Sequence, residues 1–160
     1  MKAVVQRVTN ACVTVHGNVV GKIDLGLLVY LGVGKGDSER DLEWLAQKIL
    51  GLRIFGGASP DKADKMDRNV VDVGGSLLVV SQFTLYGDVA KGLRPSFDSA
   101  MPPLEAEALY LAFVERAKQK VPVQTGTFRA DMKVRSENDG PITILLETPR
   151  ASTLNPQASS

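Results

Sequence analysis

Histidine and cysteine are almost absent from this chain of 160 residues, which has one of each, His16 and Cys12. A structural zinc site usually takes about four Cys or His ligands, and an intramolecular disulfide takes two thiols. We therefore expect no disulfide, no metal and no other cofactor. The lone thiol and the lack of a signal-peptide pattern are typical of a protein of the reducing cytoplasm.

Long hydrophobic runs and a strong net charge are also missing. The longest apolar stretch, 25–33, contains two glycines and is too short for a membrane span, so no membrane partner is expected. Nineteen Lys and Arg residues balance 18 Asp and Glu residues to a net charge of +1, which does not indicate a nucleic-acid-binding protein, and no DNA partner is expected. Only residues 116–135 are distinctly basic. Such a segment is either an anion-binding face or an ordinary solvated surface.

The first third of the chain has the pattern of β-strands. Residues 11–16 alternate, with Ala11, Val13 and Val15 on one face. Gly17-Asn18 predicts a turn, and the order of the segments predicts an antiparallel meander. We expect strands over 11–16, 19–23, 27–33, 76–85, 131–135 and 142–147.

Two helices are expected between these strands. Ser38 is a good N-cap with Asp41 three residues on, and a stripe of apolar residues follows at helical spacing: Leu42, Leu45, Ile49 and Leu52. A second helix begins near Leu104 and ends before Pro122. The class is therefore α+β, in one domain over 1–148 with a polar tail over 149–160.

Three features invite a functional interpretation that their details do not support. The glycine-rich segment 32–36 lacks the spacing of both the phosphate-binding loop and the dinucleotide fingerprint, so we interpret it as a turn between a strand and a helix. His16 precedes a turn on the outward face of a strand, where a general base is less expected than a surface side chain. Cys12 has no neighbouring cations in sequence to lower the pKa of its thiol.

Two other segments leave both interpretations open. The polar residues Ser81, Gln82 and Thr84 end a run of aliphatic residues that we expect to be buried. They lie either at the rim of a pocket or simply where a strand reaches solvent. Asn138-Asp139-Gly140-Pro141 has the composition of an ordinary turn.

Taken together, these segments resemble a known family. Residues 81–85, Ser-Gln-Phe-Thr-Leu, and 138–143, Asn-Asp-Gly-Pro-Ile-Thr, are similar to the two signature motifs of D-aminoacyl-tRNA deacylases. Further similar stretches follow in family order and extend the resemblance to about residues 1–148: 6–8, 31–33, 53–55, 92–97 and 125–132. The resemblance implies largely antiparallel β-sheets that form a barrel-like core, with two main helices packed outside.

The resemblance also implies a function. The protein would be a cytoplasmic homodimer that hydrolyses the ester between a D-amino acid and the 3′-terminal adenosine of tRNA. Gly140-Pro141, with a cis peptide bond, would enter the partner subunit's pocket and exclude L-amino acids, as a close backbone approach permits. A backbone element that excludes L-side chains does not exclude glycine, which has no side chain. Alanine tRNA mischarged with glycine is therefore an expected second substrate.

The resemblance assigns roles to nine residues. The catalytic segment would position the ester and offer backbone N–H groups to the oxyanion, while the 2′-hydroxyl of the tRNA assists the attacking water. Phe128 would stack on the terminal adenine, and Met132 would line the same pocket. The catalytic segment is Ser81, Gln82, Phe83 and Thr84, selectivity falls to Gly140 and Pro141, and Arg7 would support these two.

Two other functions remain as alternatives. A non-catalytic RNA-binding dimer would bind charged tRNA without releasing an amino acid, and a small-molecule hydrolase would use Thr84 as its nucleophile. The sequence departs from the family at Arg135-Ser136-Glu137, where more apolar residues are expected, and in the tail 149–160. Phe83 in place of a methionine favours the D-specific branch of the family.

Overall fold

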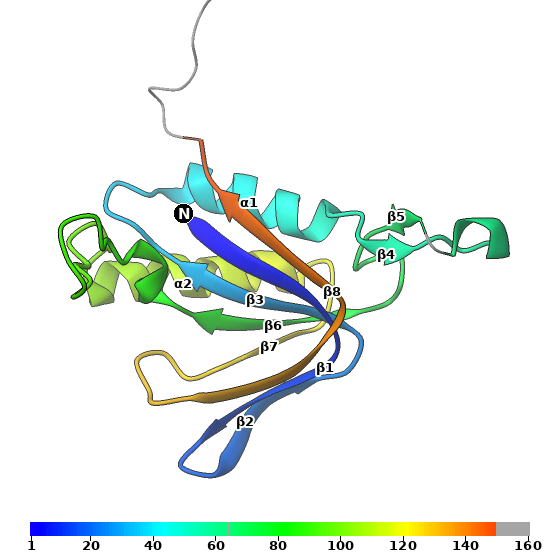
Figure 1. Cartoon of the computed structure of the whole chain (residues 1–160), viewed down its shortest axis with the longest axis horizontal. Helices are drawn as coiled ribbons and strands as arrows, with labels where there is room; N and C mark the ends of the chain where they lie inside the picture. Colours follow the sequence, from blue (N-terminus) through cyan, green and yellow to red (C-terminus); the bar gives the residue numbers. More distant parts are fainter. Residues whose placement is uncertain (64, 150–160) are drawn as a thin grey trace, which may run out of the picture.

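One long strand near the N-terminus pairs with most of the other strands of the main sheet. This computed structural model describes residues 1–63 and 65–149, so the predicted tail lies outside the described residues except for Pro149. Strand β1 (Lys2–Val15) pairs antiparallel with β2 (Asn18–Ile23) and with β3 (Gly26–Gly32) (Figure 1). The predicted meander is wrong, because β3 pairs with β1 rather than with β2. The two strands follow one another along one edge of β1, where Ala11 pairs with Ile23 and Val8 pairs with Gly26.

The predicted α+β class with a barrel-like core is confirmed, although the sheet is mixed. Strand β6 (Ser76–Ser81) runs parallel to β3, and β7 (Val123–Thr125) runs parallel to β6. Both β3 and β6 are buried on both faces, as is usual for parallel strands, and this explains their unbroken runs of aliphatic residues.

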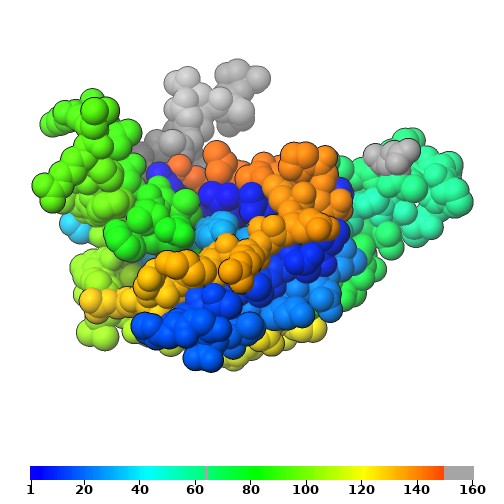
Figure 2. Space-filling view, turned by 60° about the horizontal axis from the view of Figure 1, so that its bottom comes forward, coloured from blue at the N-terminus to red at the C-terminus, as the bar shows by residue number. Residues whose placement is uncertain are grey.

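Strand β8 (Lys133–Glu147) corrects the prediction of two separate strands over 131–135 and 142–147. It lies antiparallel along β1, and Figure 2 shows it in orange across the blue β1. Gln6 pairs with Thr143 and Val8 with Asn138, so residues 139–142 form a bulge opposite Arg7 alone. A proline is tolerated here because β8 pairs only with β1 and its other edge bonds no described strand.

Both predicted helices are present. Helix α1 (Glu39–Gly51) begins after Ser38, whose backbone N–H and hydroxyl both donate to the Asp41 carboxylate at 2.9 Å. Helix α2 (Pro103–Lys118) begins with a proline, which suits the first turn of a helix. Among the described residues, neither helix is long and apolar enough to cross a membrane.

The sheet separates two hydrophobic clusters. Alternate residues of β3 and β6 face the helices, where Leu77 and Val79 pack with α1 and α2 residues such as Leu45 and Phe113. The intervening side chains, including Leu78 and Val80, pack on the other face against β1 and β2. This second cluster fills the concave interior of the barrel-like sheet.

Short elements complete the chain. A small arm comprises β4 (Phe55–Gly56), the 3-10 helix η1 (Pro60–Lys62) and β5 (Met66–Arg68) (Figure 1). The expected strand over 76–85 stops at Ser81, and the 3-10 helix η2 (Phe83–Tyr86) follows. The polar residues of this segment therefore lie where β6 ends and the backbone turns.

Candidate active site

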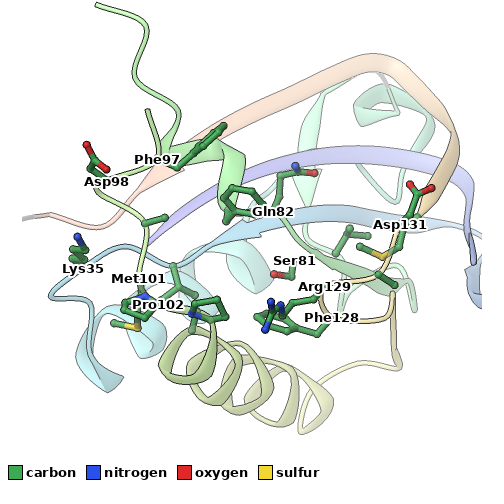
Figure 3. A pocket seen from close by; sticks show the side chains of 18 of the residues that line it. Lys35, Ser81, Gln82, Phe97, Asp98, Met101, Pro102, Phe128, Arg129 and Asp131 are labelled. Carbon is green, nitrogen blue, oxygen red and sulfur yellow. The ribbon is translucent and has the colours of Figure 1, made fainter. Parts of the chain in front are cut away.

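A pocket of about 770 Å³ opens at the carboxyl end of β6 (Figure 3). Its walls come from five parts of the chain that the sheet brings together: the turn after β3, the end of β6, the loop before α2, the first turn of α2, and the turn between β7 and β8. Among the predicted site residues, five line it: Ser81, Gln82, Phe83, Phe128 and Met132. Thr84 does not line it.

The segment Ser81–Thr84 forms one wall. Ser81 and Gln82 are half-buried, and the Gln82 N–H donates to the carbonyl of Leu31 at 2.8 Å, which fixes the backbone as it leaves the sheet. The Gln82 side-chain amide donates to the Thr84 hydroxyl. The Phe83 ring is 56% exposed and meets Phe97 edge-on, with ring centroids 5.0 Å apart.

The hydroxyl of Thr84 lacks the partner that a nucleophile needs. In the described ranges its only hydrogen-bond partner is the Gln82 amide, which cannot accept a proton. The first hydrogen bond of η2 runs from the Leu85 N–H to the Gln82 carbonyl, so the N–H groups of Phe83 and Thr84 precede it and have no acceptor within η2.

Asp37 connects the pocket wall to the start of the chain. One carboxylate oxygen accepts the Met1 ammonium group at 2.7 Å, and the other accepts the Gly34 N–H at 2.6 Å and the Tyr86 hydroxyl at 3.1 Å. The Tyr86 ring fills the space where a Gly34 side chain would lie, since an added Cβ would be 2.5 Å from the ring. Asp37 therefore fixes both η2 and the strand-to-helix turn.

The opposite wall is aromatic. The Phe128 ring lies 5.7 Å from that of Tyr110, and the Tyr110 hydroxyl donates to the Val79 carbonyl at 2.9 Å. Burial raises the pKa of Tyr110 to about 12, although a hydrogen bond with the Thr125 side chain opposes this. Tyr110 stays neutral at physiological pH and supports Phe128 from behind.

Gly140 and Pro141 lie elsewhere in the chain, in the bulge of β8. Their peptide bond is cis, and Gly140 has a φ of 126°, which favours glycine. The Arg7 Nε lies 3.2 Å from the Asp139 carbonyl oxygen and 3.0 Å from its carboxylate, while Nη1 donates to the Ile54 carbonyl at 2.6 Å. Asn138 accepts the Ile142 N–H, so side chains hold the bulge on both sides.

Across the sheet, the bulge of β8 is level with the start of β6, whereas the pocket lies at the end of β6. Arg7 pairs with Leu27, and Leu27 pairs with Leu77, four residues before Ser81 at the pocket. A strand rises about 3.3 Å per residue, so roughly 13 Å of strand separates the two sites. Arg7, Gly140 and Pro141 line a second cavity of about 410 Å³ that shares no residue with the pocket.

Sequence reasoning missed several residues that line the pocket. Phe97, Met101 and Pro102 come from an irregular loop with no periodic pattern, and their place depends on the packing of that loop against α2. Lys35 and Arg129 also line the pocket. The basic composition of 116–135 was the signal available for Arg129. Among residues 1–63 and 65–149, no cluster of Asp, Glu, His and Cys side chains could hold a metal ion.

The fold and the pocket define a small α+β protein whose candidate site lies where a central strand ends. The sequence model of the D-Tyr-tRNA(Tyr) deacylase family matches residues 4–147, and the chain belongs to that family.

Named relatives cover nearly the whole chain. It is 56% identical over 153 residues to the D-aminoacyl-tRNA deacylase of Geobacter metallireducens, covering 95% of this chain and 99% of the relative. It is 58% identical over 148 residues to the D-aminoacyl-tRNA deacylase of Pelobacter propionicus, covering 92% and 99%. The solved structure of the c-Myc DNA Unwinding Element Binding Protein superposes with a TM-score of 0.88 at 42% identity, covering 94% of this chain and all of that one.

Proposed function

We propose that this protein is a D-aminoacyl-tRNA deacylase that hydrolyses the ester between a D-amino acid and the 3′-terminal adenosine of tRNA. Family membership supports the reaction, and one observation on the pocket supports the way it would occur. The described residues that line the pocket include no His, Cys or Glu. Of its two aspartates, Asp131 pairs with Lys133, and Asp98 lies near Lys35, away from Ser81 (Figure 3). Positioning and backbone groups would therefore provide the chemistry.

The terminal 2′-hydroxyl of the tRNA would assist the attacking water in this mechanism. Ser81 and Gln82 would orient the ester, and the N–H groups of Phe83 and Thr84 would stabilise the oxyanion. Phe128 would stack on the terminal adenine, and Met132 would line the same pocket. The aromatic support from Tyr110 suits Phe128 to this role.

A homodimer would bring Gly140 and Pro141 to the pocket. The roughly 13 Å of strand between the bulge and Ser81 prevents the bulge from entering its own pocket. A partner subunit could supply it instead, and the backbone of Gly140-Pro141 would then exclude an L-side chain. Arg7 would hold this element in place, and glycyl-tRNA would be accepted because glycine has no side chain to exclude.

Three charged tRNAs test the proposal side by side. We expect release of the amino acid from D-tyrosyl-tRNA and glycyl-tRNA, and no release from L-tyrosyl-tRNA above the buffer blank. Binding of all three without release would instead support an RNA-binding dimer. Equal cleavage of the D- and L-esters would overturn the selective role of Gly140-Pro141.

The route of catalysis is tested separately. We expect Thr84→Ala to keep at least a third of the wild-type kcat, because no described group activates that hydroxyl. A tRNA ending in 2′-deoxyadenosine should be cleaved at least 100-fold more slowly, as removal of an assisting group typically costs about 10²–10⁴ in rate. Loss of turnover in Thr84→Ala with normal cleavage of the deoxy substrate would support a threonine nucleophile.

A further inference from the structure

Arg129 lines the pocket next to Phe128 and has an unusual backbone. Its φ is 62°, in the left-handed region that side chains other than glycine seldom adopt. The Ala130 N–H donates to the Thr127 carbonyl at 3.2 Å and closes the turn around it. This backbone conformation suits glycine, yet the residue is a long cation on the wall of a pocket. We take this as an indication that the Arg129 side chain has a function in the pocket.

Among residues 1–63 and 65–149, the guanidinium group of Arg129 has no anionic partner. The acid two residues away, Asp131, is occupied by Lys133, whose Nζ lies 3.2 and 3.3 Å from its carboxylate oxygens. Within the described ranges the Arg129 side chain makes no ion pair or hydrogen bond. Lys35 is the other cationic residue that lines the pocket, and it lies near Asp98, at the end of the pocket away from Arg129. Arg129 itself lies beside Phe128 (Figure 3).

We propose that Arg129 is a substrate-binding residue that contacts the phosphodiester joining the terminal adenosine of the tRNA to the preceding nucleotide. This inference rests on the proposed function, because it takes Phe128 as the platform for the terminal base. A residue adjacent to that platform reaches the backbone of the same nucleotide. Arginine suits the task, since its planar group binds two phosphate oxygens at once.

The phosphodiester is common to every tRNA and distant from the amino acid. Arg129 therefore contributes to binding of the RNA rather than to the choice between D- and L-esters. Its removal raises KM and leaves kcat and the D-to-L ratio nearly unchanged. Because each phosphate contact on a single strand contributes about −0.7 to the slope of log affinity against log salt, the salt dependence also becomes weaker.

The test compares two substrates of Arg129→Gln. With D-tyrosyl-tRNA at about 50 mM salt we expect KM to rise five- to tenfold, and the slope of log kcat/KM against log salt to fall by about 0.7 in magnitude. With 3′-O-D-tyrosyl-adenosine, which has the ester but no phosphate, we expect kcat/KM within twofold of the wild type.

Three variants separate binding from folding. Arg129→Gly removes the guanidinium while relieving the backbone, so its Tm should be no lower than that of the wild type although its KM rises. Arg129→Lys should keep the salt slope and recover part of the affinity. Arg40→Gln, which changes an exposed arginine outside the pocket, should leave both substrates unaffected.

The outcomes are distinguishable from failure of the proposed function. If the wild type cleaves neither D-ester, the proposed function is wrong. If it cleaves both, but Arg129→Gln keeps the wild-type salt slope or loses as much activity on the adenosine ester, Arg129 does not bind the phosphodiester.

Discussion

The pocket and the bulge of β8 are held in place by different kinds of contact. Behind the pocket, Asp37 accepts three donors, and Met1, whose ammonium group is one of them, is a buried residue. At the bulge, Arg7 pairs with an Asp139 side chain that is 44% exposed, and its other contacts are to backbone carbonyls. The walls of the pocket are thus fixed by buried contacts, whereas the bulge is a surface feature held by the side chains of Arg7 and Asn138.

The difference suits the roles proposed for the two regions. A pocket that positions an ester benefits from walls fixed by buried contacts, since a rate gained by positioning is sensitive to small displacements. An element that enters a partner subunit must remain at the surface of its own chain. The comparison predicts that substitutions behind the pocket reduce stability most, while those at the bulge reduce it little.

The largest effect is expected for Asp37→Ala. It leaves the Met1 ammonium group without its counter-ion, although the Thr148 hydroxyl still accepts from it. Removing one partner of a buried pair costs about 3–5 kcal/mol, and the remaining hydrogen bond places this variant at the lower end of that range. We expect the free energy of unfolding, measured by urea denaturation, to fall by about 3 kcal/mol. Asp61→Ala, at an exposed site, serves as the control. A loss below 1 kcal/mol would show that the network behind the pocket is no stronger than surface contacts.

A second prediction concerns pH and the support behind Phe128. The pKa of Tyr110 is about 12 in the folded state against about 10 unfolded, so the folded protein keeps this proton longer as pH rises. The stability is fully present below pH 10 and is lost between about pH 10 and 12.

The measurement compares wild type with Tyr110→Phe. Two pKa units correspond to about 2–3 kcal/mol over the whole transition, and linkage places about two thirds of this between pH 9.5 and 11.5. We therefore expect the free energy of unfolding of the wild type to fall by about 2 kcal/mol more than that of the variant over this range. Denaturation at several pH values gives both curves. Parallel curves would mean that Tyr110 ionises normally and is accessible to water.

Much of the fold follows from local patterns in the sequence. The cap at Ser38 and the apolar stripe of α1 depend on neighbours a few residues apart, and so does the alternation in β1. Strand order does not follow from such patterns, because a hairpin between β1 and β2 does not decide whether β3 turns back onto β2 or continues along the same edge of β1, as it does here. Nor does it decide that β8 pairs with the other edge of β1. The parallel pairing of β3 with β6 depends on contacts distant in sequence.

The site was predictable only in part for the same reason. Ser81 and Gln82 interrupt an aliphatic run, which indicates their position at the end of a strand. Gly140-Pro141 reads as a break between strands, although hydrogen bonding resumes beyond it and β8 is continuous. The separation of that bulge from the pocket depends on the register of three strands, which no local pattern encodes.

The smallest effect is expected for Asp139→Ala at the bulge. Its ion pair with Arg7 is partly exposed, and such pairs contribute about 0–1 kcal/mol. Arg7 can still donate to the Asp139 and Ile54 carbonyls in the variant, so the bulge keeps its backbone anchor. We expect the free energy of unfolding to fall by less than 1 kcal/mol and the ratio of D- to L-tyrosyl-tRNA cleavage to stay within about twofold of the wild type.

Arg7→Ala provides the contrast, because it removes the ion pair together with both backbone contacts. Two carbonyl groups then lose their donor, which costs about 1–3 kcal/mol where they are buried, and the bulge loses its support. If Asp139→Ala lowered stability or selectivity as much as Arg7→Ala, the carboxylate would be the main support of the bulge. The position of Gly140-Pro141 would then depend on a contact that salt weakens, unlike the buried contacts behind the pocket.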